Sequence, residues 1–278
     1  MADSLDFQEA YPISAKAAVH TPVVFRSGLE ALEGLPWPSL AGIRDFARFA
    51  RIGDAATRTA LSRAKAEGSL VFERDDKGVN RYRLSPAQLA MGAAVIHEEL
   101  RPEGFLVAVF SFKSEDTTER AALREALKDF GFKKLAQNAY IHGRIETSAL
   151  RAAVRKLGLE RHLFLFSCPD VDDRDLVGRI LELFELETRK KELEAYLARL
   201  RDFLPEGLAD GELARRLLYA GPVHYENCEA GEPPFPAKYL PADYPLAEIQ
   251  RFYGQRLAEG QAAMLDYYIA ISKMGGRE

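Results

Sequence analysis

A short stretch of the sequence carries side chains of the types that proteins use to read duplex DNA. Arginine donates two parallel hydrogen bonds to N7 and O6 of guanine, serine and threonine hydroxyls contact phosphates or base edges, and lysine neutralises a phosphate charge. The residues that could do this chemistry are Arg58, Thr59, Ser62, Arg63 and Lys65. Their types and spacing predict a surface that fits a major groove.

These side chains belong to a predicted helix over residues 55–67. At 100° per residue, an apolar face and a polar face separate along it. The apolar face holds Thr57, Ala60, Leu61 and Ala64, and the opposite face holds Arg58, Thr59, Ser62 and Lys65. The same pattern is typical of any surface helix whose charges are solvated. The helix by itself therefore leaves open whether its polar face contacts DNA or only solvent.

The segments before this helix predict how it is held. Ser39 is placed to cap a first amphipathic helix that runs to Phe49, and Gly53 breaks the pattern. Asp54 then offers a side-chain acceptor to the free amides of the second helix, which Gly68 ends. This order predicts a helix-turn-helix.

A β-hairpin is expected directly after the second helix. Leu70, Phe72, Tyr82 and Leu84 alternate with polar residues on either side of the turn sequence DDKG. A helix-turn-helix followed by a basic hairpin is a winged helix, whose wing contacts phosphates or the minor groove. The wing side chains expected to do so are Lys77, Asn80 and Arg81. An alternative use of the same module is to bind another protein.

Charge is distributed unevenly along the chain. The 278 residues carry 38 Lys and Arg against 42 Asp and Glu, for a net charge of −4. The segment from Arg44 to Arg83 holds ten basic and six acidic residues, which makes it +4 and leaves −8 for the remainder. A basic module on an acidic body is typical of a protein that binds nucleic acid.

Composition excludes several classes of protein. With 47% hydrophobic and 29% charged residues, the chain is neither disordered throughout nor collagen-like. It lacks the roughly 18-residue apolar window of a membrane-spanning helix, and its first residues carry acids where a secretory signal is basic and then apolar. We therefore expect a cytoplasmic protein with no membrane partner, in which Cys168 and Cys228 stay reduced.

The sequence predicts an α+β protein with three domains behind a flexible arm. Residues 1–22 show no sustained period and contain two prolines, which favours a loosely ordered arm. A winged helix-turn-helix domain is expected over 23–102, including a helix from Ser85 to Leu100. Residues 103–171 follow the β-α-β-β-α-β order of the ferredoxin-like plan, with residues 132–135 as an edge strand. An all-helical C-terminal domain is expected over 172–278.

Within that C-terminal domain, residues 173–204 are expected to form two packed helices or one broken helix. A further helix runs from Glu212 to about Tyr219, where Gly221 and Pro222 interrupt it. His224 follows the interruption. A histidine in this position is most often part of the packed structure, and the alternative is a pocket residue that meets a small-molecule effector.

Motifs of common enzymes are missing from the sequence. It contains no G-x-S-x-G, H-E-x-x-H, P-loop or G-x-G-x-x-G pattern, so we expect a protein that is not an enzyme and has no cofactor or metal. The competing hypothesis is a metal-dependent nucleic-acid-processing enzyme on the ferredoxin-like sheet. It would need Glu115, Asp116 and the acids between Asp170 and Asp175 to hold a divalent cation. Those last acids equally fit the N-terminus of a helix.

Three strings in the sequence carry a resemblance to a known family. They are A-A-T-R-T-A-L-S-R (Ala55 to Arg63) followed by E-G-S-L, A-L-R-E-A-L-K-D-F-G-F (Ala122 to Phe132) followed by N-A-Y-I-H, and Y-L-P-A-D-Y-P (Tyr239 to Pro245). In this order they resemble PaaX-like transcriptional regulators of phenylacetic-acid degradation. The first string is the most specific of the three.

The resemblance implies a homodimeric repressor with an N-terminal winged helix, a Cas2-like ferredoxin-fold middle domain without nuclease activity, and a helical C-terminal domain. It also implies a double-stranded DNA operator and an aryl-CoA thioester as the small-molecule effector. Carried over to this sequence, Arg58, Thr59, Ser62 and Arg63 would lie on the DNA-contacting helix, and His224 near the C-terminal histidine motif. Tyr225 and Arg215 are the further residues expected to contact the effector. The sequence departs from the family where it reads Y-A-G-P-V-H-Y-E-N-C around His224.

Overall fold

The structure is a computed structural model that describes residues 6–27, 35–88, 103–113, 116–143, 147–233 and 235–275. The chain forms two compact units. The first combines the described parts of Met1–Glu98, Leu193–Gly231 and Pro245–Glu278, and the second those of Glu99–Glu192 and Glu232–Tyr244. The predicted boundaries after residues 22, 102 and 171 cut the chain into successive pieces, whereas these units join segments that are far apart in sequence.

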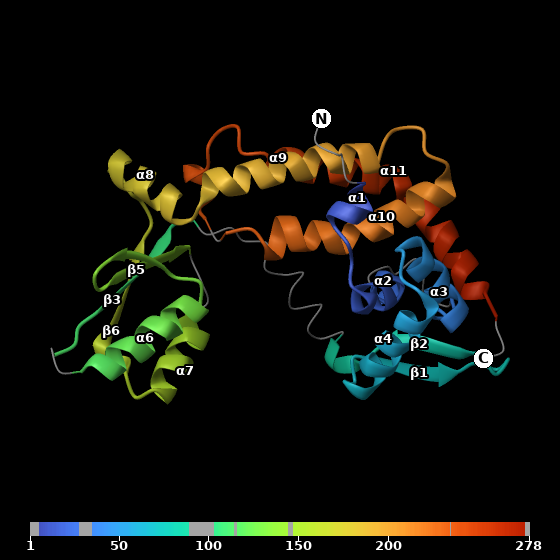
Figure 1. Ribbon diagram of the computed structural model, residues 1–278, viewed down its shortest axis with the longest axis horizontal. Coiled ribbons are helices and arrows are strands. Elements are labelled where there is room, and N and C mark those ends of the chain that lie inside the picture. The colour runs from blue at the N-terminus through green and yellow to red at the C-terminus, as the bar shows by residue number, and fades with distance from the viewer. Residues whose placement is uncertain are drawn as a thin grey trace. The chain divides into compact units, whose positions relative to one another are not determined.

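The first unit contains the predicted helix-turn-helix and hairpin (Figure 1). Its helices are α1 (Phe7–Ala10), α2 (Ala15–Ser27), α3 (Leu40–Phe49), α4 (Asp54–Ala66), α10 (Asp210–Tyr225), α11 (Leu246–Lys273) and the part of α9 (Leu186–Phe203) that begins at Leu193. Strands β1 (Leu70–Arg74) and β2 (Asn80–Leu84) pair antiparallel, with Leu70 opposite Leu84. The pairing confirms the hairpin and its register.

Local signals set the ends of α3 and α4 largely as expected. The Ser39 hydroxyl accepts a hydrogen bond from the Gly42 amide at 3.2 Å, which confirms Ser39 as the N-cap of α3. Gly68 adopts a φ of 69° just after α4, a conformation that glycine reaches without steric cost. The prediction for Asp54 is wrong, because the N-cap of α4 is Gly53. The Asp54 carboxylate instead pairs with Arg48 at 3.1 Å, a charged partner one helix earlier.

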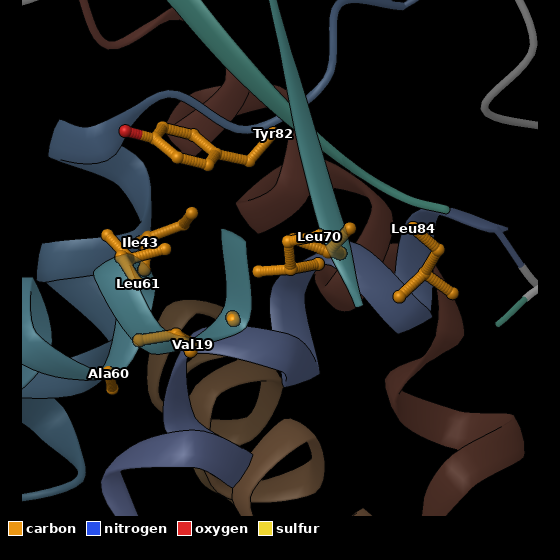
Figure 2. Packing of buried hydrophobic residues seen from close by; sticks show 9 residues of the cluster. Val19, Ile43, Ala60, Leu61, Leu70, Tyr82 and Leu84 are labelled. Atoms are coloured by element: carbon orange, nitrogen blue, oxygen red, sulfur yellow. The ribbon is translucent and has the colours of Figure 1, made fainter. Parts of the chain in front are cut away.

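A single apolar cluster holds the winged helix together (Figure 2). Its buried members come from α2, α3, α4 and both strands of the hairpin: Val19, Val23, Ile43, Ala60, Leu61, Ala64, Leu70, Tyr82 and Leu84. In Figure 2 the side chains of Val19, Ile43 and Leu61 converge between the helices, with Leu70 and Leu84 entering from the strands. Burial of this apolar surface is the main term that stabilises the module.

The prediction of a loosely ordered arm over residues 1–22 is wrong for its described part. Residues from Ala15 on form α2, which packs against α3 and α4 as the first helix of the winged helix. Pro22 lies inside α2, where a proline costs about 3 kcal/mol. Ala18, Val19 and Val23 are fully buried, and burial of their side chains offsets that cost.

The second unit is built on a four-stranded antiparallel sheet with strand order β4-β5-β3-β6. Its strands are β3 (Phe105–Phe110), β4 (Lys133–Ala136), β5 (Ala139–Gly143) and β6 (Leu163–Cys168), and its helices are α6 (Thr117–Asp129), α7 (Thr147–Lys156), α8 (Arg174–Leu183) and the start of α9. The order β3-α6-β4-β5-α7-β6 confirms the ferredoxin-like plan, with β4 as the predicted edge strand.

One face of this sheet forms a core with α6 and α7 (Figure 1). Alternate residues of the strands point into it, because successive side chains of a strand face opposite sides. Ala108, Phe110 and Tyr140 from the strands meet Leu123 and Leu150 from the helices, and all five are buried. Gly131, with φ of 78°, ends α6 as expected.

Of two helices in the C-terminal half of the chain, α8 begins where the acidic run predicts and α10 departs from the prediction. The acidic run after β6 starts α8, where the Asp173 carboxylate accepts hydrogen bonds from the amides of Asp175 and Leu176. Helix α10 continues through Gly221 and Pro222, so the predicted interruption there is wrong. A π-helical turn over Glu226–Ala230 follows directly. Most of the helix expected from Ser85 to Leu100 lies outside the described residues.

Among the described helices, none is long and apolar enough to cross a membrane.

Candidate nucleic-acid interface

Helix α4 buries one side and exposes the other, as the sequence predicts. Thr57, Ala60, Leu61 and Ala64 are buried against the winged-helix core. The exposed residues of α4 include Arg58, Thr59, Ser62, Arg63 and Lys65, all of the candidate DNA-contacting residues of the helix. The Thr59 hydroxyl donates to the Ala55 carbonyl at 3.0 Å, which leaves its oxygen lone pairs facing solvent. The predicted division of faces is confirmed, and the use of the outer face remains a prediction.

The hairpin is tied to the front of the helix-turn-helix by a short stretch of backbone pairing. Ser39, just before α3, forms an antiparallel bridge with Arg81 of β2. The Tyr82 amide donates to the Pro38 carbonyl at 2.9 Å. Three helices, this bridge and the hairpin complete the winged-helix arrangement, and α4, the helix in the position of a recognition helix, therefore shares one module with the wing.

Lys65 joins the recognition helix to the wing. Its Nζ atom lies 3.9 Å from the centre of the Phe72 ring and 5.3 Å from that of Tyr82. Phe72 is 49% exposed, so the ammonium sits over an aromatic ring at the protein surface. A cation over an aromatic face is attracted by the ring quadrupole. Lys65 is thereby positioned between α4 and β1.

The turn of the wing is organised by Asp75. Its carboxylate accepts hydrogen bonds from the amides of Lys77 and Val79, each at 2.9 Å, and Gly78 takes a φ of 76°. These backbone hydrogen bonds, together with the Arg81 guanidinium, hold the pKa of Asp75 below its ordinary value. Lys77 is exposed at the tip of the wing, while Asn80 is half-buried at the start of β2.

Arg81 has a different place from the one the sequence analysis gives it. Its side chain is only 11% exposed, and its Nε donates to Asp75 at 2.8 Å. Its Nη1 donates to the carbonyls of Trp37 and Ser272, at the entry to α3 and at the end of α11. Its Nε and Nη1 donors are thus taken up within the protein. The expectation that Arg81 contacts phosphate is therefore corrected, because sequence alone does not show which partners a hairpin arginine finds.

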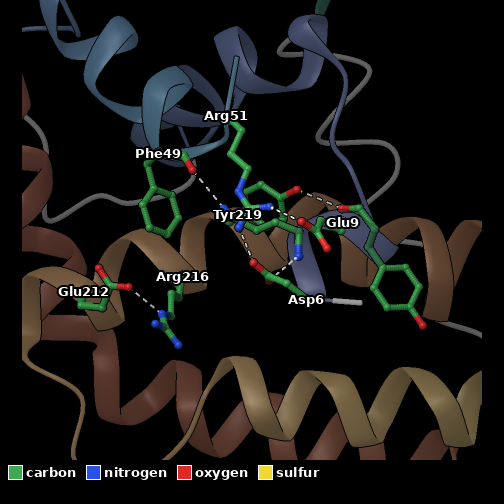
Figure 3. A network of polar contacts seen from close by, with 9 residues as sticks. Asp6, Glu9, Phe49, Arg51, Glu212, Arg216 and Tyr219 are labelled. Atoms are coloured by element: carbon green, nitrogen blue, oxygen red, sulfur yellow. Dashed lines mark hydrogen bonds and ion pairs between the residues drawn. The ribbon is translucent and has the colours of Figure 1, made fainter. Parts of the chain in front are cut away.

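The turn between α3 and α4 is held by the N-terminal residues (Figure 3). Arg51 adopts a left-handed φ of 60°, and its guanidinium pairs with Asp6 and with Glu9, the latter at 3.3 Å. Gln8 donates to the Phe49 carbonyl at 3.0 Å. These contacts place α1 against the turn, so the segment expected to be an arm helps to fix the recognition helix.

Most of the remaining cations of the helix-turn-helix and hairpin fall into two groups. Arg48 and Arg83 pair with Asp54 and Glu73. Among the residues that the structure describes, Arg58, Arg63, Arg74 and Lys77 form no ion pair, and all four are exposed. Exposed and unpaired cations on α4 and the wing give this surface the positive charge that phosphate binding requires.

The residues expected at an effector site do not come together. His224 is buried, its ring stacks on Tyr253 at 4.2 Å between centroids, and burial lowers its pKa to about 4. Arg215 lies elsewhere on α10, 3.4 Å from the Asp45 carboxylate and stacked over Tyr267. Tyr225 is 42% exposed. The structure therefore gives a packed role to His224 and an ion pair to Arg215.

Comparisons with known proteins bear on the middle of the chain. Residues 103–177 match the family described as the PaaX protein central Cas2-like domain. This segment is therefore similar to a PaaX-type central domain. The match confirms the resemblance drawn from the sequence and includes the whole β3-α6-β4-β5-α7-β6 order.

The fold is also found in a solved structure. The uncharacterized protein Rv0674 from Mycobacterium tuberculosis is similar with a TM-score of 0.55 and 19% identity, covering 93% of this chain and 98% of its own. This likeness shows a shared fold across nearly the whole length. No curated protein matches the chain.

The acidic residues of the PaaX-type domain are used in local structure where they are described. Asp116 accepts a hydrogen bond from the Lys113 amide, Asp173 caps α8, and Asp170 pairs with Lys238. Glu115 lies outside the described residues. Within the described ranges, no three His, Cys, Asp or Glu side chains gather in a way that could hold a metal ion.

Proposed function

We propose that this protein is a DNA-binding transcriptional regulator that reads its operator with α4 and the wing. One observation carries the proposal: the exposed face of α4 presents Arg58, Ser62 and Arg63 beside a wing that carries Lys77, and the described carboxylates leave these cations unpaired. Arg58 then specifies base pairs, while Arg63 and Lys77 contact phosphates and set the register. The PaaX-type central domain supports the same regulator class.

The proposed active form is a homodimer acting in the cytoplasm. Two copies place two recognition helices in successive major grooves, about 34 Å apart, so the operator is an imperfect palindrome. Occupancy of that site blocks transcription, which makes the protein a repressor of an aromatic-acid catabolic operon of the phenylacetate type. The support for repression and for the operon is the resemblance to PaaX-like regulators.

The proposed effector is an aryl-CoA thioester, typically phenylacetyl-CoA. An effector lowers DNA occupancy only by as much as it prefers the form of the protein that does not bind DNA. Tyr225 offers an exposed aromatic ring for such a ligand, whereas His224 would first have to leave its place against Tyr253. The effector site is therefore proposed near Tyr225, without Arg215.

A direct experiment tests the regulator. Fluorescence anisotropy measures binding to a duplex from upstream of the protein's own gene, at two salt concentrations and with or without phenylacetyl-CoA, against an unrelated duplex of equal length. We expect preferential, salt-sensitive binding that the thioester releases. Equal affinity for both duplexes contradicts the regulator, and specific binding that ignores aryl-CoA esters and free aryl acids contradicts the effector alone.

A further inference from the structure

The end of α11 lies against the winged helix within the first unit (Figure 1). Contacts recur along its last turns. Tyr267 donates to the Asp45 carboxylate of α3 at 2.7 Å, and Tyr268 donates to the Pro36 carbonyl at 3.3 Å. Further along, the carbonyls of Ser272 and Met274 accept hydrogen bonds from the winged helix. The end of α11 thus contacts both α3 itself, at Asp45, and the segment that precedes α3, at Pro36 and Ser39.

The carbonyls at the end of a helix have no partner within the helix and must find one elsewhere. At the end of α11, the carbonyls of Ser272 and of the C-cap residue Met274 are satisfied by residues of the winged helix. The Ser39 hydroxyl donates to the Met274 carbonyl at 2.7 Å while it also accepts from the Gly42 amide. Arg81 donates to the Ser272 carbonyl, and a cation at a helix C-terminus is favoured by the helix dipole.

Close backbone approach accompanies these hydrogen bonds. A Cβ atom added to Gly42 would lie 2.5 Å from the carbonyl oxygen of Ile271 and 3.1 Å from its carbonyl carbon. Only glycine allows α3 and α11 to come this near. Ile271 and Ser272 are completely buried. The end of α11 is therefore fitted to the winged helix by shape as well as by hydrogen bonds.

Arg81 extends this contact to the tip of the wing. The same guanidinium that reaches the Ser272 carbonyl also binds Asp75, and Asp75 holds the amides of Lys77 and Val79. An unbroken series of hydrogen bonds thus runs from the last turn of α11 to the wing turn. Each of these hydrogen bonds joins a charged group to a backbone group or to another charged group. A shift of the wing relative to α11 would therefore break at least one of them.

We propose that the last turn of α11 braces the wing for DNA binding, with Arg81 as the positioning residue that joins the two. The proposal rests on the proposed function and adds to it a dependence of wing geometry on the C-terminal helix. It also gives an effector bound to the helical segments a physical route to the DNA-reading surface. Arg81 acts through Asp75 and Lys77 and does not touch DNA itself.

The first experiment compares Arg81→Met with Lys77→Met in DNA binding as a function of salt. Methionine keeps much of the side-chain length and removes the donors and the charge. For Arg81→Met we expect roughly tenfold weaker binding, because a free wing loses its preorganisation, with the salt-dependence slope unchanged. For Lys77→Met the magnitude of the salt-dependence slope should fall by about one, the value expected for the loss of one phosphate contact. An equal fall in slope for Arg81→Met would mean direct phosphate contact and would overturn the proposal.

A second variant perturbs the other side of the contact. Gly42→Ala forces α11 away from α3 without changing any group on the wing or on the exposed face of α4. The matched control is Gly254→Ala, because Gly254 lies in α11 and has open space around it. We expect roughly tenfold weaker DNA binding for Gly42→Ala at an unchanged salt slope, and wild-type binding for Gly254→Ala.

Hydrogen exchange of the free protein separates this inference from the proposed function. Amides of residues 77–82 should exchange faster in Arg81→Met and in Gly42→Ala than in wild type, while amides of α4, in the same unit, stay unchanged as an internal check of folding. Unaltered exchange in the wing of both variants would overturn the brace. This outcome does not depend on DNA, so a wild-type protein that fails to bind any duplex refutes the proposed function and leaves the exchange result to decide the brace.

Discussion

The Nζ atom of Lys65 lies 3.9 Å from the centre of the Phe72 ring, and this contact joins the recognition helix to the first strand of the wing. Both residues are exposed, so the ammonium keeps part of its hydration while it is held over the ring. A cation–π contact at such a site contributes about 0.5 to 1 kcal/mol. The contact also places the positive charge of Lys65 between α4 and the wing.

We expect Lys65 and Phe72 to be energetically coupled. A double-mutant cycle of Lys65→Met and Phe72→Leu, followed by chemical denaturation, should give a coupling energy of about 0.5 to 1 kcal/mol. Lys65→Met alone should also lower the salt-dependence slope of DNA binding by about one. Additive effects of the two substitutions on stability would refute the coupling, and an unchanged slope would remove Lys65 from the DNA-contacting set.

Arg58 is expected to carry sequence preference. It is exposed near the start of α4 and forms no ion pair with the described residues, so its guanidinium is available to a guanine edge. Arg58→Ala should cost about 1 to 3 kcal/mol of operator binding and reduce discrimination against a mutated operator. Arg179→Ala, an exposed arginine of α8 in the other unit, controls for the loss of one charge. Wild-type discrimination by Arg58→Ala would contradict this assignment.

Helix α2 should be needed for the stability of the first unit. Val19 is completely buried in α2, while Val24 on the same helix is 50% exposed. Val19→Ala should lower the free energy of unfolding by about 2 kcal/mol, and Val24→Ala should change it by less than about 0.5 kcal/mol. Fluorescence of Trp37, the single tryptophan of the sequence, reports unfolding of the first unit. Similar effects of the two substitutions would mean that α2 is not part of that core.

His224 should make stability depend on pH. Burial lowers its pKa from 6.5 to about 4, so between these values the unfolded chain binds the proton more readily than the folded protein does. The contribution of neutral His224 is therefore fully present above about pH 6.5 and is lost as pH falls toward 4, by up to about 3 kcal/mol.

His224→Phe tests this dependence, because phenylalanine retains a ring against Tyr253 and does not titrate. Unfolding by urea, followed through Trp37 at several pH values between 4 and 7, should show a shallower loss of stability in the variant than in wild type. His162→Phe, in the other unit, controls for the removal of a histidine. Parallel curves for His224→Phe and wild type would show that His224 is not the group responsible.

Sequence patterns by themselves determined the order of elements and the faces they bury. The 3.6-residue period of α4 assigned Ala60 and Leu61 to the core, and alternation around DDKG fixed the hairpin. The β-α-β-β-α-β order followed from the same two periods. These features are local, because a helix or strand repeats its buried side within a few residues.

Tertiary structure alone decided which partner covers each buried side. Pro22 favours a break, yet α2 forms because Val19 and Val23 pack against side chains of α3 and α4. Pro222 likewise lies inside α10. Propensity is a preference of a few kcal/mol at most, and burial against a distant segment exceeds it.

The same limit applies to the site. Exposure of Arg58 and Ser62 could be predicted, since it depends only on the period of their own helix. The role of Arg81 could not, because its partner Ser272 is 191 positions away in sequence. A charged side chain in a hairpin can serve DNA or the protein with equal chemistry, and only the folded chain places a helix C-terminus within its reach.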